Sequence, residues 1–190
     1  MWTLPLVGKE GKVVSFEPSP ANLSILEWHR SRNHFSQWAI VPRAVSDVDA
    51  KEEFFLVDAG DSPMNSLTTG APGTPLMSGR DIRKISIQTI TLDTFCSEVG
   101  VRPDLVKIDV EGAELLVLRG AAKLLGESCP TIILAVHPYW LPKGHSSQQI
   151  FELLTRYGYS VYDSQGCPVE YLQSGEYLCL SARAGPAVAQ

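Results

Sequence analysis

The sequence has no run of basic residues, no long apolar segment and no pair of cysteines at the spacing of a metal or redox site. Its 190 residues carry a net charge of −5, which argues against a nucleic-acid partner because proteins that neutralise phosphates present basic patches. The longest apolar run, 131–141, is interrupted by His137 and Pro138 and is far shorter than the roughly 20 residues of a membrane span. We therefore expect neither a nucleic-acid partner nor a membrane span.

The few cysteines of the chain are scattered: Cys96, Cys129, Cys167 and Cys179. Because none of them forms a CxxC pair, the sequence indicates no zinc or dithiol site. We expect reduced and mostly buried thiols. The first residues show neither the basic segment nor the cleavage pattern of a signal peptide, so a cytoplasmic location is expected.

The composition is that of a globular domain, with 44% hydrophobic and 19% charged residues. A chain of this length favours one domain. We expect that domain to cover residues 1–183 and the tail 184–190 to be disordered.

Short apolar segments alternate with helical patterns along the chain. Strands are expected at 13–16, 38–45 with an interruption at Pro42, 53–57, 85–90, 105–108, 131–136, 159–162 and 176–181. Helices are expected at 20–32, 111–125 and 146–157, and a long Gly/Pro-rich loop at 59–79. Because apolar strands alternate with helices, we predict an α/β fold with a largely parallel sheet, helices on both faces and an antiparallel edge.

Polar residues follow three of the predicted strands, and ligands of such sheets bind at the carboxyl ends of the strands. Glu17 is placed to accept hydrogen bonds from ribose hydroxyls, although an ordinary turn residue beside a proline explains it equally well. Asp109 and Glu111 follow a central strand, where the amino end of the next helix also attracts acids. His137 is a candidate base, although a histidine with a purely structural role is the more common case.

Several segments carry a resemblance when they are taken together. They are VVSFEPSPANLSIL, AVSD, NSL, TITLDTF, DLVKIDVEGAELLVLRGA and ILAVHP, in order from Val13 to Pro138. This series resembles the FkbM family of S-adenosylmethionine-dependent methyltransferases, with KIDVEGAE as its most specific part. The resemblance implies a Rossmann-like class I methyltransferase fold, S-adenosylmethionine as cofactor and methylation of a hydroxyl on a small molecule or glycan.

The resemblance also implies roles for individual residues. Glu17 is expected to hold the ribose, and Ser46 and Asp47 are expected near the adenine. Asp109 and Glu111 are expected at the reaction end of the crevice, where Asp109 orients the acceptor or the charged end of the cofactor. His137 is expected to assist as a proton acceptor. No metal is assigned, because no ligand spacing in the sequence demands one.

The sequence departs from the family in two places. Ala135 and Val136 stand where the family often has a glutamate. The larger departure is the family's first strand with its Asp-x-Gly-x-x-x-Gly-like loop, which this sequence does not contain. A glycine loop precedes the ribose acid by about 20 residues, and counting back from Glu17 passes Met1. We expect the strand between 13–16 and 106–108 to be missing, its two neighbours to lack a partner and the reading frame to continue upstream.

Three functions remain open at this point. The first is a methyltransferase whose chain begins too late, and the second is a non-catalytic methyltransferase-like binding module. The third is a nucleotide-binding oxidoreductase, because an acid at position 17 suits a nicotinamide cofactor equally well. The KIDVEGAE run favours the first two. The sequence indicates neither the acceptor nor the oligomeric state.

Overall fold

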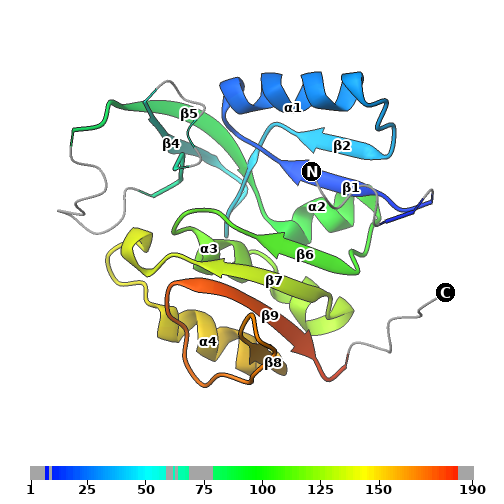
Figure 1. Cartoon of the computed structure of the whole chain (residues 1–190), viewed down its shortest axis with the longest axis vertical. Coiled ribbons are helices and arrows are strands. Elements are labelled where there is room, and N and C mark those ends of the chain that lie inside the picture. Colours follow the sequence, from blue (N-terminus) through cyan, green and yellow to red (C-terminus); the bar gives the residue numbers. More distant parts are fainter. Residues whose placement is uncertain (1–6, 9, 59–61, 63, 69–78, 184–190) are drawn as a thin grey trace.

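The computed structural model describes residues 7–8, 10–58, 62, 64–68 and 79–183. Its strands lie in a layer flanked by helices (Figure 1). At one side, β1 (Val13–Phe16) pairs in parallel with β2 (Trp38–Val41). At the other, the strand order is β6-β7-β9-β8, with β6 and β7 parallel and the remaining pairs antiparallel. Their bounds are Leu105–Ile108 for β6, Thr131–Val136 for β7, Tyr159–Tyr162 for β8 and Gly175–Ser181 for β9.

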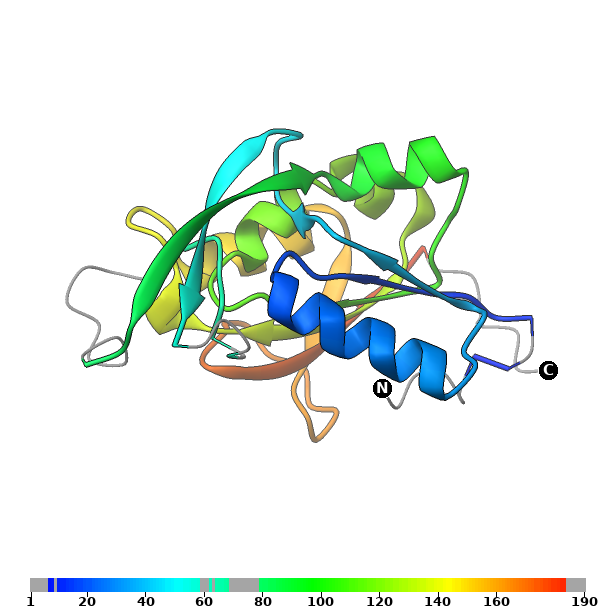
Figure 2. The same cartoon turned by 90° about the horizontal axis from the view of Figure 1, so that it is seen from above.

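A third group of strands forms a hairpin that projects from this layer (Figure 2). In it β5 (Ile82–Ile90) pairs antiparallel with β4 (Lys51–Val57) and parallel with the short β3 (Ala44–Val45). The predicted interruption at Pro42 is confirmed, because β2 ends at Val41 and β3 begins at Ala44. Most of the predicted loop 59–79 lies outside the described residues, as does the predicted tail 184–190.

Helices cover both faces of the layer, as expected. Figure 2 shows α1 (Pro20–Arg32) and α2 (Leu92–Val99) on opposite sides of β1 and β2. The remaining helical segments are α3 (Glu114–Arg119), the π-helix η2 (Leu124–Ser128), the 3-10 turn η3 (Pro138–Trp140) and α4 (Ser147–Arg156). This arrangement confirms the α/β, Rossmann-like fold class.

The layer is divided between β1 and β6. Within the described part of the chain, β1 pairs only with β2, and β6 pairs only with β7. These are the two strands that the sequence argument expects to lack a partner. Side chains help to join the halves, with the rings of Phe16 and Phe95 in edge contact at 4.9 Å between centroids. In Figure 1 β1, β6 and β7 point the same way, so their carboxyl ends share one side of the layer.

The main hydrophobic core belongs to the second half of the chain. All of its buried members come from Leu92 onward, and they line the interfaces of β6, β7, β8 and β9 with α3 and α4. A smaller core of Ala44, Phe54, Leu56 and Ile87 lies within the hairpin group. By contrast, α1 has no buried residue. The first strands and their helix are therefore supported by much less burial.

The predicted continuous helix 111–125 is wrong. It begins only at Glu114, because the preceding turn has positive φ values, and α3 ends at Arg119. The chain turns at Gly120, where an added Cβ would overlap the Ser46 carbonyl, and the Gly120 carbonyl accepts from the Asp93 N–H at 3.0 Å. The Asp93 carboxylate then accepts from the N–H groups that open the next segment, Lys123 and Leu124, both at 2.8 Å. Tertiary contacts therefore divide one helical pattern into two.

Helix α2 is not among the predicted helices, although its boundaries carry sequence signals. The Thr91 hydroxyl accepts from the Thr94 N–H at 3.0 Å, and Gly100 ends the helix with a φ of 68°.

The four cysteines are free thiols: Cys129 and Cys179 are buried, Cys96 is half-buried and Cys167 is exposed. Burial raises the pKa of the Cys179 thiol to about 12, so it stays protonated. Among the described helices, none has the length and apolar character needed to cross a membrane.

Candidate active site

A tight turn after β6 presents two of the predicted site residues. Glu111 has a φ of 48° and Gly112 a φ of 98°, so two successive residues adopt the left-handed side of backbone space. A side chain at Gly112 would overlap the Trp140 carbonyl that follows β7. The turn therefore packs directly against the segment after the neighbouring strand, and only glycine fits this position.

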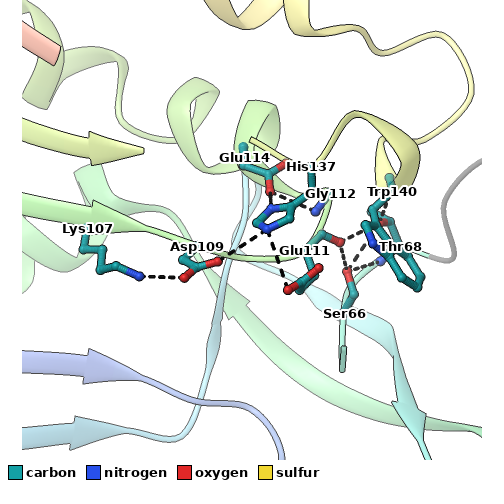
Figure 3. Close-up of polar contacts among 9 residues, drawn as sticks. All are labelled: Ser66, Thr68, Lys107, Asp109, Glu111, Gly112, Glu114, His137 and Trp140. Atoms are coloured by element: carbon teal, nitrogen blue, oxygen red, sulfur yellow. Dashed lines mark hydrogen bonds and ion pairs between the residues drawn. The ribbon is translucent and has the colours of Figure 1, made fainter. Parts of the chain in front are cut away.

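The segment before the undescribed loop fixes this turn. The Ser66 hydroxyl donates to the Glu111 carbonyl at 2.7 Å, and the Thr68 hydroxyl donates to the Trp140 carbonyl at 2.9 Å. Both side chains are buried, and Ser66 is anchored by a β-bridge to Phe55. The NSL segment thus acts structurally, by holding the backbone of Glu111 in place (Figure 3).

Three predicted site residues meet at this edge of the sheet. His137 Nε2 lies 3.7 Å from Asp109 Oδ1 and 3.8 Å from Glu111 Oε1. Figure 3 shows the imidazole between these two carboxylates on one side and Glu114 on the other. The side chains of His137 and Glu111 are 23% and 21% exposed, so solutes can reach the cluster. Asp109 also accepts from Lys107 Nζ at 2.6 Å through its other oxygen.

Glu114 orients the imidazole of His137 through its Nδ1 atom. Its carboxylate is fully buried, and Oε1 lies 2.7 Å from His137 Nδ1 and accepts from the Gly112 N–H at 3.0 Å. A carboxylate at Nδ1 holds the proton on that nitrogen and turns Nε2 toward Asp109 and Glu111. The second oxygen, Oε2, is buried without a partner among the described residues.

The acidic side chains of this cluster shift the pKa values of its members. The hydrogen bond to Glu114 raises the pKa of His137, and the nearby carboxylates add to this against the opposing effect of burial. Burial raises the pKa of Glu111, and the charges of Asp109 and Glu114 raise it further while His137 lowers it. Three carboxylates therefore surround one imidazole. Because the pKa values of His137 and Glu111 are both raised, each of these two groups holds a proton more readily than it does in water.

Glu17 lies at the carboxyl end of β1 and is half-buried. Its Oε1 accepts from the Ser19 N–H at 2.8 Å, and its Oε2 accepts from the Asn22 amide at 3.4 Å. Burial raises its pKa, and these two hydrogen bonds oppose the rise. The carboxylate thus already serves the amino end of α1, yet each oxygen keeps a second lone pair for a ligand hydroxyl.

Ser46 and Asp47 are not in contact with the Asp109–Glu111–His137 cluster. Ser46 is fully buried, its N–H donates to the Ile90 carbonyl at 3.1 Å and its carbonyl is covered by Gly120. Its hydroxyl donates to Asp47 Oδ1 at 3.4 Å. The contacts of Ser46 are structural, and its predicted place near an adenine stays a prediction together with that of Asp47.

Sequence reasoning misses the role of Glu114 and of the residues that fix the turn. In the sequence Glu114 resembles any acid at the start of a helix. It stands between the apolar residues Ala113 and Leu115 on a buried face, which is an unusual place for a carboxylate. Ser66 lies in one of the segments that carried the resemblance, and that is the only signal that could have found it.

Comparisons with known proteins agree with this arrangement. Residues 2–161 match the model of the methyltransferase FkbM domain. A solved structure of methyltransferase FkbM from Methylobacillus flagellatus KT shares the fold with a TM-score of 0.54 and 16% sequence identity. The similarity covers 89% of this chain and 36% of that one, so this chain spans little more than a third of the solved protein. A comparison with curated proteins finds none that matches.

The family match extends over most of the chain and includes β1, β6 and β7 together with Asp109, Glu111 and His137. The chain therefore belongs to the FkbM methyltransferase family.

Proposed function

We propose that this chain binds S-adenosylmethionine and methylates a hydroxyl of a small molecule or sugar. The observation that carries the proposal is the convergence of Asp109, Glu111 and His137 at the carboxyl ends of β6 and β7, with His137 held by buried Glu114. In a methyltransferase family this cluster is the described group of side chains best suited to receive an acceptor hydroxyl.

The cofactor's adenosine end fits the residues beside β1. Glu17 has the partial burial and the spare lone pairs that a ribose diol needs. It directly follows β1, whose carboxyl end lies on the same side of the layer as those of β6 and β7 (Figure 1). S-adenosylmethionine supplies a methyl group that is already activated on a sulfonium sulfur. For its methionine end the described residues contain no glycine-rich loop at a strand end, where such groups are usually bound.

The protein's own residues then position the acceptor and take its proton. Asp109 orients the acceptor hydroxyl. As the hydroxyl oxygen gains the methyl group it loses its proton, and His137 Nε2 accepts that proton. Glu114 keeps Nε2 available for that proton by bonding Nδ1.

A second candidate is a methyltransferase-like binding module without catalysis. Among the described residues β1 and β6 each have one unpaired edge, and this favours the second candidate, because a divided sheet holds the two ends of a crevice less rigidly than a continuous one.

Calorimetric titration with S-adenosylmethionine and S-adenosylhomocysteine tests the cofactor-binding part of the proposal. Glu17→Ala is expected to weaken binding by roughly 10- to 100-fold, because a hydrogen bond to a charged group contributes about 1.5–3 kcal/mol. The matched control is Glu98→Gln on the exposed face of α2, which should leave the affinity unchanged. Equal affinities for wild type and Glu17→Ala would remove Glu17 from the site. The absence of any binding by the wild-type chain would favour the binding module.

A further inference from the structure

The Asp109–Glu111–His137 cluster has the composition of a metal site as well as that of a base. Two carboxylate oxygens and one imidazole nitrogen lie within 4.8 Å of one another. Ligands about 2.0–2.2 Å from one ion and about 90–120° apart stand roughly 2.8–3.8 Å from each other. The distances of 3.7 and 3.8 Å from His137 Nε2 already fall at the upper end of this range.

Glu114 supplies a second and independent observation. Metal-bound histidines usually donate their other ring N–H to a carboxylate, which fixes the ring and strengthens the bound nitrogen as a ligand. Glu114 Oε1 lies 2.7 Å from His137 Nδ1 and is the carboxylate that accepts this hydrogen bond, although Glu114 is fully buried. Its Oε2 has no partner among the described residues, so a buried negative charge that faces the ring is incompletely compensated. A cation bound at Nε2, the ring nitrogen that faces away from Glu114, would help to compensate that charge.

We propose that Asp109 Oδ1, Glu111 Oε1 and His137 Nε2 bind one divalent transition-metal ion. Mixed oxygen and imidazole donors suit Mn²⁺ or Zn²⁺ better than Mg²⁺ or Ca²⁺, which prefer oxygen alone. Lys107 does not occupy the position, because it contacts Asp109 through the other oxygen, Oδ2. The partly exposed carboxylates leave room for water or an acceptor hydroxyl as further ligands.

This ion site follows from geometry and does not require the proposed methyl transfer. If both hold, they are linked through the lone pair on His137 Nε2, which takes either a proton or the ion. The ion-free cluster then acts as a base, whereas the loaded cluster makes a neighbouring hydroxyl more acidic.

Mn²⁺ alone is the probe, and it is added to the metal-stripped chain without cofactor or acceptor. Electron paramagnetic resonance of the free ion is expected to report one bound Mn²⁺ per chain. Glu111→Gln removes a direct ligand and should weaken Mn²⁺ binding by about 10- to 100-fold. Glu114→Gln should weaken it by about 10-fold, because loss of a carboxylate that supports a ligand histidine costs about that much in other metal sites. Glu98→Gln, an exposed acid of α2 outside the cluster, is the matched control and should bind like wild type.

A measurement on the wild-type chain covers the case in which a variant does not fold. Bound Mn²⁺ broadens nuclear magnetic resonances close to it, so the ring signals of His137 should disappear before those of His29, His34 and His145. Wild-type binding no tighter than about 1 mM would overturn the proposal. The proposal would also fail if the ring signals of another histidine disappeared before those of His137. Equal Mn²⁺ affinities of wild type and Glu111→Gln would contradict it as well. None of these outcomes bears on S-adenosylmethionine binding, which calorimetry tests separately.

Discussion

The two halves of the strand layer differ in how firmly they hold their polar residues. In the β6–β7 half, four of the six residues of α3 are buried, and the site residues rest on that helix and on the main core. In the β1–β2 half, none of the 13 residues of α1 is buried, and Glu17 rests on two local hydrogen bonds. The proposed reaction end of the site is therefore preorganised, whereas the proposed ribose end depends on a helix with little buried surface.

The largest expected effect tests whether stability follows this division. Leu118 of α3 is fully buried in the main core, so Leu118→Ala should lower the free energy of unfolding by about 3–5 kcal/mol. Leu23 of α1 is only partly buried, so Leu23→Ala should cost about 1 kcal/mol. Urea unfolding followed by circular dichroism gives both values. Equal costs would mean that the two halves are equally well packed, and the comparison would fail.

The next effect is confined to the turn that carries Glu111. Gly112→Ala should cost about 2–4 kcal/mol, because a positive φ strains alanine and its Cβ overlaps the Trp140 carbonyl. Gly144→Ala is the matched control, since Gly144 also has a positive φ of 87° but has open space around it. It should cost only about 1 kcal/mol in the same urea experiment. A Gly112→Ala variant no less stable than Gly144→Ala would show that the turn is not tightly packed.

Within the β6–β7 half, the sequence predicts the strands better than the helices. The bounds of β6 and β7 follow from short, mainly apolar segments, and the meeting of Asp109, Glu111 and His137 follows from parallel strands that end on one side. Residue periodicity cannot show that Gly120 passes against Ser46, so it predicts one helix where the structure has α3 and η2.

The role of Glu114 escapes sequence reasoning for a related reason. It lies 23 residues from His137, and no local pattern indicates that the two side chains touch. Glu114 is buried where it contacts His137, and burial of a carboxylate depends on the tertiary packing of α3 against β7. Acidic residues are common at the first turn of helices, so the position of Glu114 in the sequence does not by itself predict its contact with His137.

The smallest expected effect concerns Glu17 and asks whether it serves the fold or a ligand. Burial raises its pKa above the ordinary 4.5, so the folded state binds this proton more tightly than the unfolded state does. Glu17 therefore contributes stability that is fully present below about pH 4.5 and is lost as the pH rises through its folded pKa. Glutamine keeps the oxygen that accepts from the Ser19 N–H but cannot ionise, so Glu17→Gln should gain stability relative to wild type between pH 4 and pH 7.

The companion measurement is calorimetric titration of the same variant with S-adenosylmethionine. A neutral amide accepts hydrogen bonds from ribose hydroxyls less strongly than a carboxylate, so binding at pH 7 should weaken by about 10-fold. Opposite signs for stability and binding are typical of a residue kept for its ligand, because a partly buried charge costs stability that only binding offsets. If Glu17→Gln instead loses stability at pH 7 and binds the cofactor like wild type, then Glu17 serves the amino end of α1 alone. The thinly supported half of the layer would then have no described residue assigned to the ribose.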